Sequence, residues 1–508
     1  MCLLDRSKWG WKSRHGLRCC LALMFAVALV AAAHGQMTVA PALSAESAVD
    51  GVLSQQSGST QAGAALAKDP FLGSVTAAKA TPGVVDISLD EAIAMGLDHN
   101  LGLVLQQQTQ RATEAETLVA FNALLPEVSA QAQTSVEQID LVALGFKPAL
   151  IASFGPNLHF SPIVKVNYTS AQVNLSQTLF NLSAFELYRT AKEDVRGAAL
   201  DTLNARGAVI LGAGDAYLQA LADEAQVANA KALLSSDELL MRQARDKDQA
   251  GVATHLDALR AQVQFQAQEE TLIQAQVALE KDKIALKRRI GIDPAQKIRL
   301  TDPAPFAELA ALPLEQAKSI AYGRRKDYLS VLSQIRAMQS ERKAVRYQHL
   351  PTLSFNGNYG VTGETTGLYH GTFFAAGNLD FPIFQEAKLR GEREVVDAQL
   401  NGLMQRAADL RVAIDGQIRS SMLDVHAADQ LVGVARSQVD LAKEEVDQAT
   451  ERFQAGVDDD LRVVQAQAAL ADAQSSLVNS LRQYNEAKLA LARDTGVVET
   501  QYKDYLGR

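Results

Sequence analysis

Residues 244–268 read ARDKDQAGVATHLDALRAQVQFQAQ, and residues 449–474 read ATERFQAGVDDDLRVVQAQAALADAQ. The two stretches superpose without a gap, so that Gly251 falls on Gly456 and, further along, Gly291 falls on Gly496. An internal repeat decides the architecture before any single element does. The chain is therefore predicted to contain one structural unit twice.

A seam of small and apolar residues follows each of these first glycines, at spacings of three and four residues. In the second copy it comprises Val463, Ala466, Leu470, Ala473, Leu477, Ser480, Tyr484, Ala487 and Leu491. A heptad seam sustained over this length makes helices coil around one another with left-handed supercoil. Alanine at many seam positions lets the helix axes approach closely. We expect long antiparallel coiled-coil helices.

Two proline-free stretches, 181–250 and 384–455, predict the long helices. At the rise of an α-helix each spans on the order of 100 Å. Shorter helices would stack end to end beside them, and Gly251 and Gly456 would form the turns at the far tip, because glycine readily adopts left-handed backbone angles. The predicted pairs of shorter helices are 89–125 with 252–290, and 314–350 with 457–495.

The first short helix has a clear beginning and a clear end. Ser88 is a predicted N-cap, and Glu91 three residues later completes a capping box. Proline ends the helix at Pro126, and Pro351 ends its counterpart in the second copy. The repeat thus extends well beyond the stretch that reveals it.

Segments of period-two alternation follow each of these prolines. Apolar residues alternate with polar ones over 127–136 and 352–361, and return strands are predicted near 165–178 and 371–382. Strands of about ten residues with one apolar face are typical of lipid-facing β-barrels. A half-buried sheet of a soluble protein gives the same alternation, so the pattern alone leaves both open.

The ends of the chain and the joint between the copies complete the predicted organisation. A basic start and an apolar run predict a signal peptide, and all three cysteines (Cys2, Cys19, Cys20) lie within it. The predicted segments are a signal peptide at 1–35, a low-complexity and mostly disordered stretch at 36–86, repeat 1 at 87–293, a linker at 294–313 (irregular, with a little helix), repeat 2 at 314–496 and a tail at 497–508.

Composition and motifs exclude several function classes. The net charge of −9 leaves no footprint for nucleic acid. Without the signal peptide the chain has no disulfide, no thiol nucleophile and no cysteine metal site. The histidines show no metal-ligand spacing, and no paired acid and base stand out. We predict a protein that is not an enzyme, with no cofactor and no metal.

Four strands from one chain would leave unpaired edges, which lipid does not tolerate. Several identical chains that contribute equally to one β-barrel and one helical cylinder would resolve this, and three chains would give twelve strands. The fold class predicted is mainly α with a small β part: antiparallel coiled-coil helices plus four strands per chain, in a two-fold internal repeat.

The order, spacing and duplication of these motifs resemble the TolC-like outer-membrane efflux protein family. The resemblance covers about Ile87 to Gly496 and includes Ser-Leu-Asp-Glu-Ala-Ile at 88–93 and Leu-Ser-Gln-Thr-Leu-Phe at 175–180. It implies a homotrimer in the outer membrane, with a twelve-stranded β-barrel and a periplasmic α-barrel. It also implies a passive exit duct of tripartite efflux or type I secretion, coupled to a periplasmic adaptor (membrane fusion protein) and an inner-membrane transporter.

The resemblance also implies roles for the tip residues. The predicted adaptor contacts are Gly251, Val252, Ala253, Gly456 and Val457. The family often narrows its entrance with aspartates shortly after the second tip glycine, but the positions six and nine residues after it are Arg462 and Gln465 here. The other constriction residues predicted are Asp458, Asp459, Asp460 and, in the first repeat, Asp257.

Two interpretations of this acidic run stay open. Three chains would bring the carboxylates of Asp458–Asp460 near one ring, a field that favours cations. Alternatively, they are a solvated helix start that complements the helix dipole. A rival function is a soluble periplasmic coiled-coil adaptor or scaffold. An adaptor, however, would show Gly-rich β segments around one hairpin, whereas this chain has two equivalent hairpins.

Overall fold

The structure is a computed structural model, and it divides the chain into two units, Met1–Ala67 and Lys68–Arg508. The described residues all belong to the second unit: 69–507 without 76–78, 141, 144–162, 252–253, 303–306, 311, 456 and 458–459. The predicted signal peptide and most of 36–86 lie outside them. Within these ranges, no helix combines the length and apolar character needed to cross a membrane.

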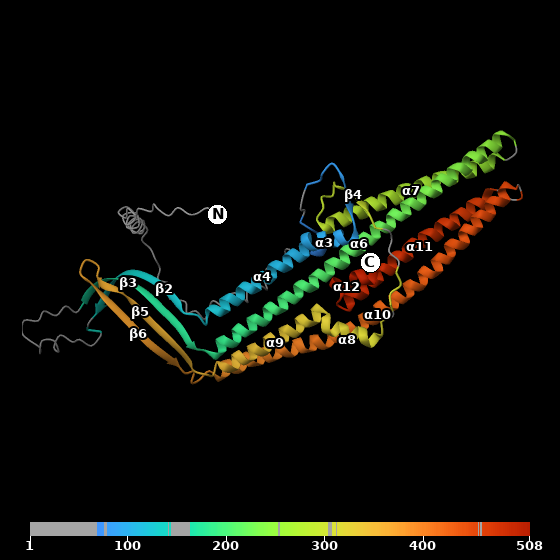
Figure 1. Cartoon of the computed structure of the whole chain (residues 1–508). Coiled ribbons are helices and arrows are strands. Elements are labelled where there is room, and N and C mark those ends of the chain that lie inside the picture. The colour runs from blue at the N-terminus through green and yellow to red at the C-terminus, as the bar shows by residue number, and fades with distance from the viewer. Residues whose placement is uncertain are drawn as a thin grey trace, which may run out of the picture. The chain divides into compact units, whose positions relative to one another are not determined.

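The helices form one layer with a definite order. The long helix α6 (Leu182–Gln249) contacts α4 (Leu101–Asn122) and α7 (His255–Ile290) on one side, and α9 (Lys326–Tyr347) and α11 (Asp460–Asp494) on the other. The second long helix, α10 (Glu386–Gln454), contacts α9 and α11 (Figure 1). The layer therefore has α4 and α7 at one edge and α10 at the opposite edge.

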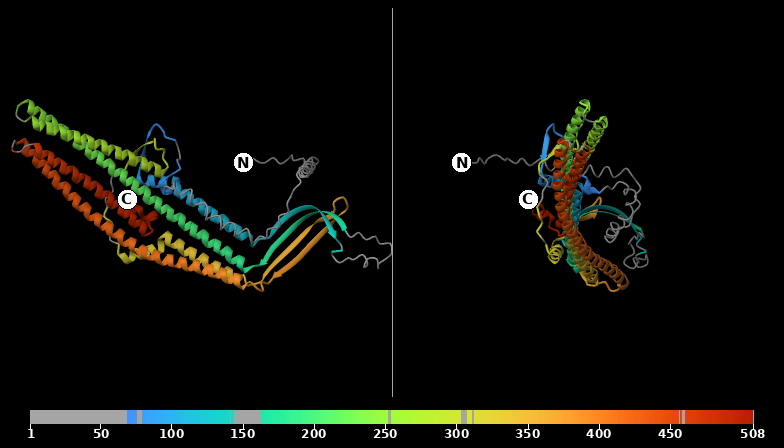
Figure 2. Two further views of the ribbon diagram at one scale, coloured as in Figure 1. Left: turned by 180° about the vertical axis from the view of Figure 1, so that it is seen from behind. Right: turned by 90° about the vertical axis from the view of Figure 1, so that its right-hand side faces the viewer.

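A four-stranded antiparallel sheet lies at one end of these helices, and α6 and α10 end at the opposite end (Figures 1 and 2). The strand order is β2-β3-β5-β6. The strands are β2 (Glu127–Asp140), β3 (Ile163–Phe180), β5 (Thr352–Glu364) and β6 (Tyr369–Asp380). β2 follows α4 and β6 precedes α10, so each edge of the sheet lies on the same side as one edge of the helix layer.

The strand register separates an apolar face from a polar one. Ala130 pairs with Val173, Val173 with Tyr359, and Tyr359 with Phe373, while the intervening positions bring Ser, Gln and Asn together. Tyr359 is 71% exposed and Phe373 is 80% exposed. A half-buried sheet of a soluble protein would have its apolar face covered by other parts of the protein. Among the described residues nothing packs over this face.

Two of the four shorter helices are each broken once, which the sequence analysis did not predict. Helix 89–125 is divided into α3 (Leu89–His99) and α4 at Asn100, and helix 314–350 into α8 (Leu314–Arg324) and α9 at Arg325. Asn100 takes extended angles, and its side chain accepts a hydrogen bond from the Leu103 amide, 3.3 Å away, which caps α4. The predicted capping box of Ser88 and Glu91 is present.

The second break is held by an arginine instead of a cap. The Arg325 guanidinium is almost completely buried and makes two hydrogen bonds to the Asp327 carboxylate, at 3.1 and 2.6 Å. It also donates to Gln417 of α10 at 2.6 Å. The break at Arg325 is therefore tied to both its own helix and the neighbouring long helix.

A small parallel sheet joins the first repeat to the segment between the repeats. It pairs β1 (Val84–Ile87) with β4 (Lys297–Leu300), and a short 3-10 helix, η2 (Pro70–Leu72), precedes it. β1 thus begins within the stretch predicted to be mostly disordered (36–86), and β4 lies within the linker predicted to be irregular with a little helix (294–313). Four-residue strands have no period to detect, and their partners lie far apart in sequence.

The main core lies where this small sheet meets the middle of the helices. α12 (Val498–Leu506), in the predicted tail, packs there through buried Val498 and Leu506. Gly291 takes a left-handed φ of 84° and Gly496 one of 77°. A side chain at Gly291 would collide with His99, and one at Gly496 with the backbone of Arg325, so each repeat closes its last helix tightly against its own helix break.

Candidate functional site

The first hairpin turn sits at the end of α6 farthest from the four-stranded sheet. Gly251 has a φ of 72°, the left-handed conformation predicted for a tip glycine. Asp257 forms a capping box with Thr254, accepting hydrogen bonds from its amide at 3.2 Å and its hydroxyl at 2.7 Å. Arg260 lies 3.6 Å from the same carboxylate. The helix start alone thus accounts for this aspartate, and its role in a constriction stays a prediction.

The second hairpin turn is only partly described. Of the predicted tip and constriction residues, Val252, Ala253, Gly456, Asp458 and Asp459 lie outside the described residues. Val457 is exposed, and Asp460 is the first residue of α11. Arg462 and Gln465 are exposed on the first turns of α11, whereas Val463 and Ala466 are buried. Arginine and glutamine therefore occupy the accessible face there.

The two hairpins contact each other through a few polar side chains that the sequence analysis missed. Near the tip, the Lys247 ammonium lies 3.7 Å from the centroid of the Phe453 ring. Further from the tip, Gln467 donates to the Ser236 hydroxyl at 2.6 Å, and Ser475 donates to Gln226 at 2.8 Å. Each pair joins helices of different repeats, so no local motif marks it.

One face of α6 carries a series of aspartates that the sequence analysis also missed. This acidic stripe comprises Asp194, Asp201, Asp215, Asp223 and Asp237. The Tyr217 hydroxyl contacts the Ile87 carbonyl oxygen at 3.1 Å and the Asp302 carboxylate at 2.9 Å, beside the small sheet. Two residues along a helix correspond to a rotation of about 200°. Asp215 and the stripe therefore face away from the small sheet. Their near-heptad spacing was the available signal.

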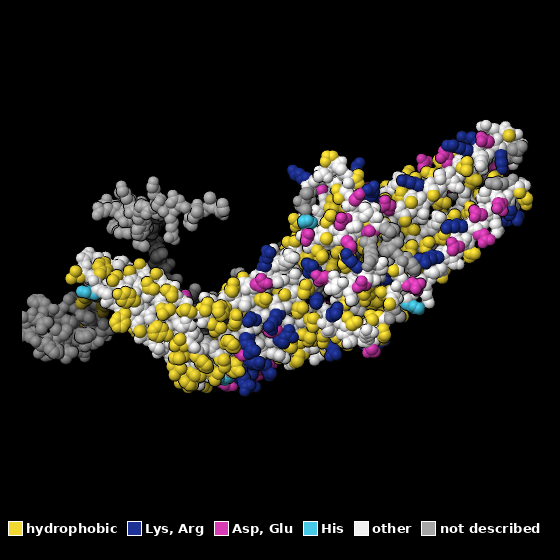
Figure 3. Space-filling model, in the orientation of Figure 1, with side chains coloured by type: hydrophobic (Ala, Val, Ile, Leu, Met, Phe, Trp, Pro, Cys, Tyr) yellow, Lys and Arg dark blue, Asp and Glu magenta, His cyan; other side chains and the backbone are white. Residues whose placement is uncertain are grey.

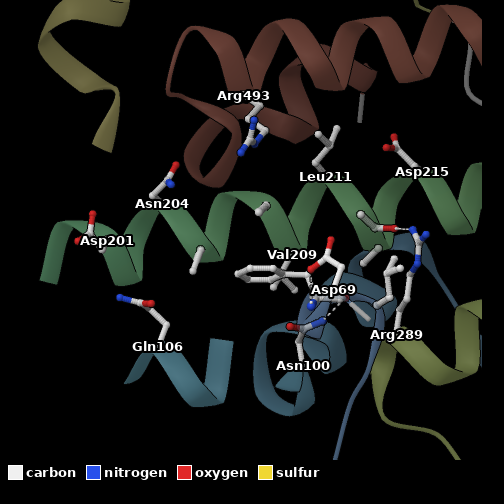
Figure 4. A pocket seen from close by; sticks show the side chains of 16 residues that line it. Asp69, Asn100, Gln106, Asp201, Asn204, Val209, Leu211, Asp215, Arg289 and Arg493 are labelled. Carbon is white, nitrogen blue, oxygen red and sulfur yellow. Dashed lines mark hydrogen bonds between the residues drawn. The ribbon is translucent and has the colours of Figure 1, made fainter. Parts of the chain in front are cut away.

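A pocket of about 710 Å³ lies along this part of α6. Asp201, Asn204 and Asp215 line it from α6, Arg289 from α7 and Arg493 from α11 (Figure 4). Arg289 donates to the Gly212 carbonyl oxygen at 2.6 Å, which keeps its guanidinium against the backbone of α6. The described residues contain no group of three or more His, Cys, Asp or Glu that could hold a metal ion. Apolar side chains, among them Phe71 and Leu72 of η2, complete the lining.

The comparison with protein families decides the identity. The family described as outer membrane efflux protein matches residues 93–291 and 319–497, which is well over half of the chain and covers both repeats. The chain belongs to the outer membrane efflux protein family. The predicted resemblance and fold class are thereby confirmed.

Named relatives of this efflux protein are distant. The pyoverdine export outer membrane protein OpmQ of Pseudomonas aeruginosa is 24% identical over 317 residues, 61% of this chain and 65% of OpmQ. The chain thus matches slightly less than two thirds of that relative. The outer membrane protein TolC of Vibrio cholerae is 23% identical over 398 residues, 74% of this chain and 88% of TolC.

Solved structures show the same fold. The Campylobacter jejuni CmeC outer membrane channel is 17% identical and superposes with a TM-score of 0.68, over 86% of this chain and 95% of that one. The outer membrane protein VceC of Vibrio cholerae is 16% identical with a TM-score of 0.65, over 80% and 96%. This efflux protein is an outer membrane protein that extends into the periplasm.

Burial and neighbouring carboxylates raise the pKa of several aspartates in the acidic stripe of this efflux protein. Burial, together with Glu486, raises the pKa of Asp215 to about 7, although Arg289 and Arg482 oppose the shift. Burial and the neighbouring Asp282 raise the pKa of Asp223 to about 6. Burial raises the pKa of Asp194 to about 6 as well, assisted by Glu341 of α9, Glu116 of α4 and Glu193. Asp194, Asp215 and Asp223 therefore change charge between about pH 5 and pH 8.

The substitution Asp215→Asn is expected to stabilise the efflux protein at pH 8. A carboxyl whose pKa is raised by folding favours the folded state below its unfolded pKa, and this contribution is lost as pH rises to the folded pKa. One buried oxygen of Asp215 also has no hydrogen-bond partner. After allowance for partial exposure, we expect a gain of about 2 kcal/mol at pH 8 that vanishes below about pH 4.

Thermal unfolding of both proteins from pH 4 to pH 8 measures this difference. Asp440→Asn, at an exposed position of α10, serves as the control and should leave the midpoint unchanged. A variant less stable than the parent at pH 8 would contradict the raised pKa.

Proposed function

We propose that three copies of this protein form a passive exit duct across the outer membrane and periplasm. The observation that carries the proposal is that two edges of the chain have no partner among the described residues, and that each edge continues from helix to strand. One edge consists of α4, α7 and β2, and the other of α10 and β6. In a closed ring, each edge of one copy pairs with the opposite edge of the next copy, so that no edge is left without a partner. A ring of three copies contains twelve strands.

The α10 edge is suited to such a joint. α10 has a buried apolar stripe against α9 and α11 that includes Ile414, Ile418 and Val432. It also has a second, exposed series of apolar residues, for which the described residues supply no partner. This second series comprises Val395, Val412, Leu423, Val434 and Leu441. A helix with apolar residues on two faces is expected to be covered on both.

The opposite edge offers a complementary seam. Exposed apolar residues on α7 occupy positions a and d of one heptad frame: Leu256, Leu259, Val263, Ile273, Val277 and Ile284. On α4, Leu105, Leu118 and Val119 are exposed in the same way. Two seams of this kind pack knobs into holes. The α10 of one copy would therefore lie against α7 and α4 of the next.

The face of the layer that carries the acidic stripe would line the duct. The small sheet β1–β4 and α12 cover the other face, and their bulk fits the outside of a ring better than its interior. A water-filled channel lined by rings of carboxylates favours cations. We propose that the duct selects weakly for cations, through Asp194, Asp215 and Asp223.

The ends of the hairpins would engage the rest of an export system. We propose that a periplasmic adaptor contacts the tips at Gly251–Ala253 and Gly456–Val457, and that an inner-membrane transporter supplies the energy. OpmQ is named for pyoverdine export, so siderophores are the first cargo to test. Constriction of the entrance by Asp257, Asp458–Asp460, Arg462 or Gln465 stays a prediction, to be tested by Asp-to-Asn variants in conductance.

Fractionation of cells that express the full chain tests the proposed function directly. A trimer extracted from outer membranes, with a mass three times that of the chain by native mass spectrometry and a conductance in planar bilayers, is expected. A soluble periplasmic monomer would contradict the duct and favour the adaptor or scaffold.

The contact between Lys247 and Phe453 predicts how the tips are held in the resting duct. A cation over an aromatic ring contributes about 0.5–1 kcal/mol at an exposed site. Lys247→Ala is expected to raise the mean conductance of single channels, because the two hairpins separate more often. Lys231→Ala, which removes the same charge from an exposed position of α6, should not. If Lys247→Ala and the parent had equal conductance, the contact between Lys247 and Phe453 would not hold the tips together in the resting duct.

A further inference from the structure

A cluster of basic side chains lies where α9 and α10 approach the four-stranded sheet. This basic cluster comprises Arg342, Lys343, Arg346, His349 and Arg393, around a cavity of about 820 Å³. Figure 3 shows dark-blue side chains gathered there, directly beside the yellow hydrophobic surface of the strands. The cluster and the apolar surface are thus neighbours along the molecule.

The apolar surface fixes the level of the membrane next to the cluster. Ile383 is 94% exposed and Phe384 is 92% exposed, immediately before α10 begins at Glu386. Large exposed apolar side chains at this level mark the boundary of the hydrocarbon region. Arg346 is the last residue but one of α9, and Arg393 lies about two helical turns after the start of α10, so both are within about 10 Å of the helix ends that face the sheet. Long basic side chains extend from such positions to the headgroups.

The described residues neutralise only part of the charge in the cluster. Arg342 is paired with Asp397 at 2.6 Å. In the described part of the chain no carboxylate pairs with Lys343, Arg346 or Arg393. The guanidinium of Arg393 lies 3.2 Å from the His349 ring nitrogen, and its Nε is buried without a hydrogen-bond partner. The cluster therefore has donors available for an anion.

The first repeat shows that the fold does not require these charges. The offset that brings Pro126 onto Pro351 places Thr117, Leu118, Phe121 and Leu124 at the positions of Arg342, Lys343, Arg346 and His349. Phe121 instead packs against Tyr188, with ring centroids 5.2 Å apart. The same helix end is thus apolar in one repeat and basic in the other.

We propose that the basic cluster binds the phosphate of an anionic phospholipid from the periplasmic leaflet of the outer membrane. Arginine guanidinium groups match phosphate oxygens in paired hydrogen bonds. Basic pockets at the membrane surface bind anionic headgroups in this way. On α9, Lys343 and Arg346 lie two and five residues after Glu341, so they face about 140–160° away from this residue, which adjoins Asp194 of the acidic stripe. The cluster therefore belongs to the outside of the proposed duct, where lipid is present.

Native mass spectrometry of the full-length protein, purified in its native oligomer and delipidated in detergent, tests this proposal. The probes are phosphatidylglycerol, phosphatidylcholine with the same acyl chains, and inorganic phosphate. The parent protein should retain phosphatidylglycerol in preference to phosphatidylcholine. In the variant K343Q/R346Q/R393Q the affinity should fall about 100-fold, because each basic residue near an anionic lipid contributes roughly fivefold. In R346Q alone the affinity for phosphatidylglycerol should fall about fivefold. This single variant replaces the triple variant in the test if the triple variant does not assemble.

The matched control is K231Q/K281Q/K443Q, which removes three exposed positive charges from α6, α7 and α10 away from the sheet. It should bind phosphatidylglycerol as the parent does. Equal retention by the cluster variant and the parent overturns the proposal, as does equal binding of the two lipids. Competition by inorganic phosphate at lipid-equivalent concentration would make the cluster a general anion site and also overturns it. Conductance is measured separately, so a failed duct and a failed lipid site are distinguishable.

Discussion

Leu423→Glu together with Leu441→Glu on α10 is expected to prevent assembly of this efflux protein. In the single chain the two side chains are 68% and 65% exposed, so the substitutions should change the stability of an isolated copy by less than about 0.5 kcal/mol. In the proposed ring both positions are buried against the next copy. Each buried carboxylate without a partner then costs several kcal/mol. The ring repeats this cost at every interface.

Native mass spectrometry of the detergent-extracted protein measures its oligomeric state. We expect monomers of the double variant where the parent gives trimers. Leu239→Glu is the matched control, because Leu239 is 57% exposed but lies on α6, an inner helix of the layer. It should leave the trimer intact. A trimer that survives both glutamates on α10 would show that this edge is not the joint between copies.

The sequence was sufficient for the parts of the fold that repeat. The heptad seams predicted α7 and α11, the two proline-free stretches predicted α6 and α10, and the capping box placed the start of α3 at the correct residue. The helix breaks at Asn100 and Arg325 were not predicted, because good helix formers stand on both sides of each break. The breaks depend on tertiary contacts. Arg325, for example, is fixed by Gln417 of another helix. Local propensity is a weak prior wherever such contacts decide.

The predicted tip and constriction residues stay predictions, and the acidic stripe was not predicted from the sequence. The tip aspartates were chosen because the resemblance pointed to them, yet the carboxyls with strongly raised pKa lie on α6, in the middle of the chain. Their spacing is visible in the sequence, but the pKa of Asp215 depends on Glu486 and Arg289, which α11 and α7 bring to it. No sequence pattern shows that three helices meet there. The heptad spacing of acids alone would also describe a solvated helix face.

Replacing Asp194, Asp215 and Asp223 together by asparagine is expected to remove most of the cation preference of the channel. In the proposed trimer these residues contribute nine carboxyls to the lining of the duct. Charges of one sign in a narrow aqueous passage focus the electrostatic potential there. This raises the local concentration of counter-ions by about tenfold or more. The reversal potential in a gradient of potassium chloride across a planar bilayer measures the preference. We expect it to move towards zero in the variant at pH 8.

The dependence of this potential on pH separates the stripe from other charges. Because the pKa of Asp215 is about 7 and those of Asp194 and Asp223 are about 6, the carboxyls are largely neutral at pH 5 and largely ionised at pH 8. The parent channel should therefore gain cation preference as pH rises through this range, while the variant should change little. Asp440, Asp447 and Asp504, all exposed, supply the control when changed to asparagine. If this control lost its preference as well, general surface charge and not the stripe would set the selectivity. If the parent showed no change between pH 5 and pH 8, the acidic stripe could not line the duct.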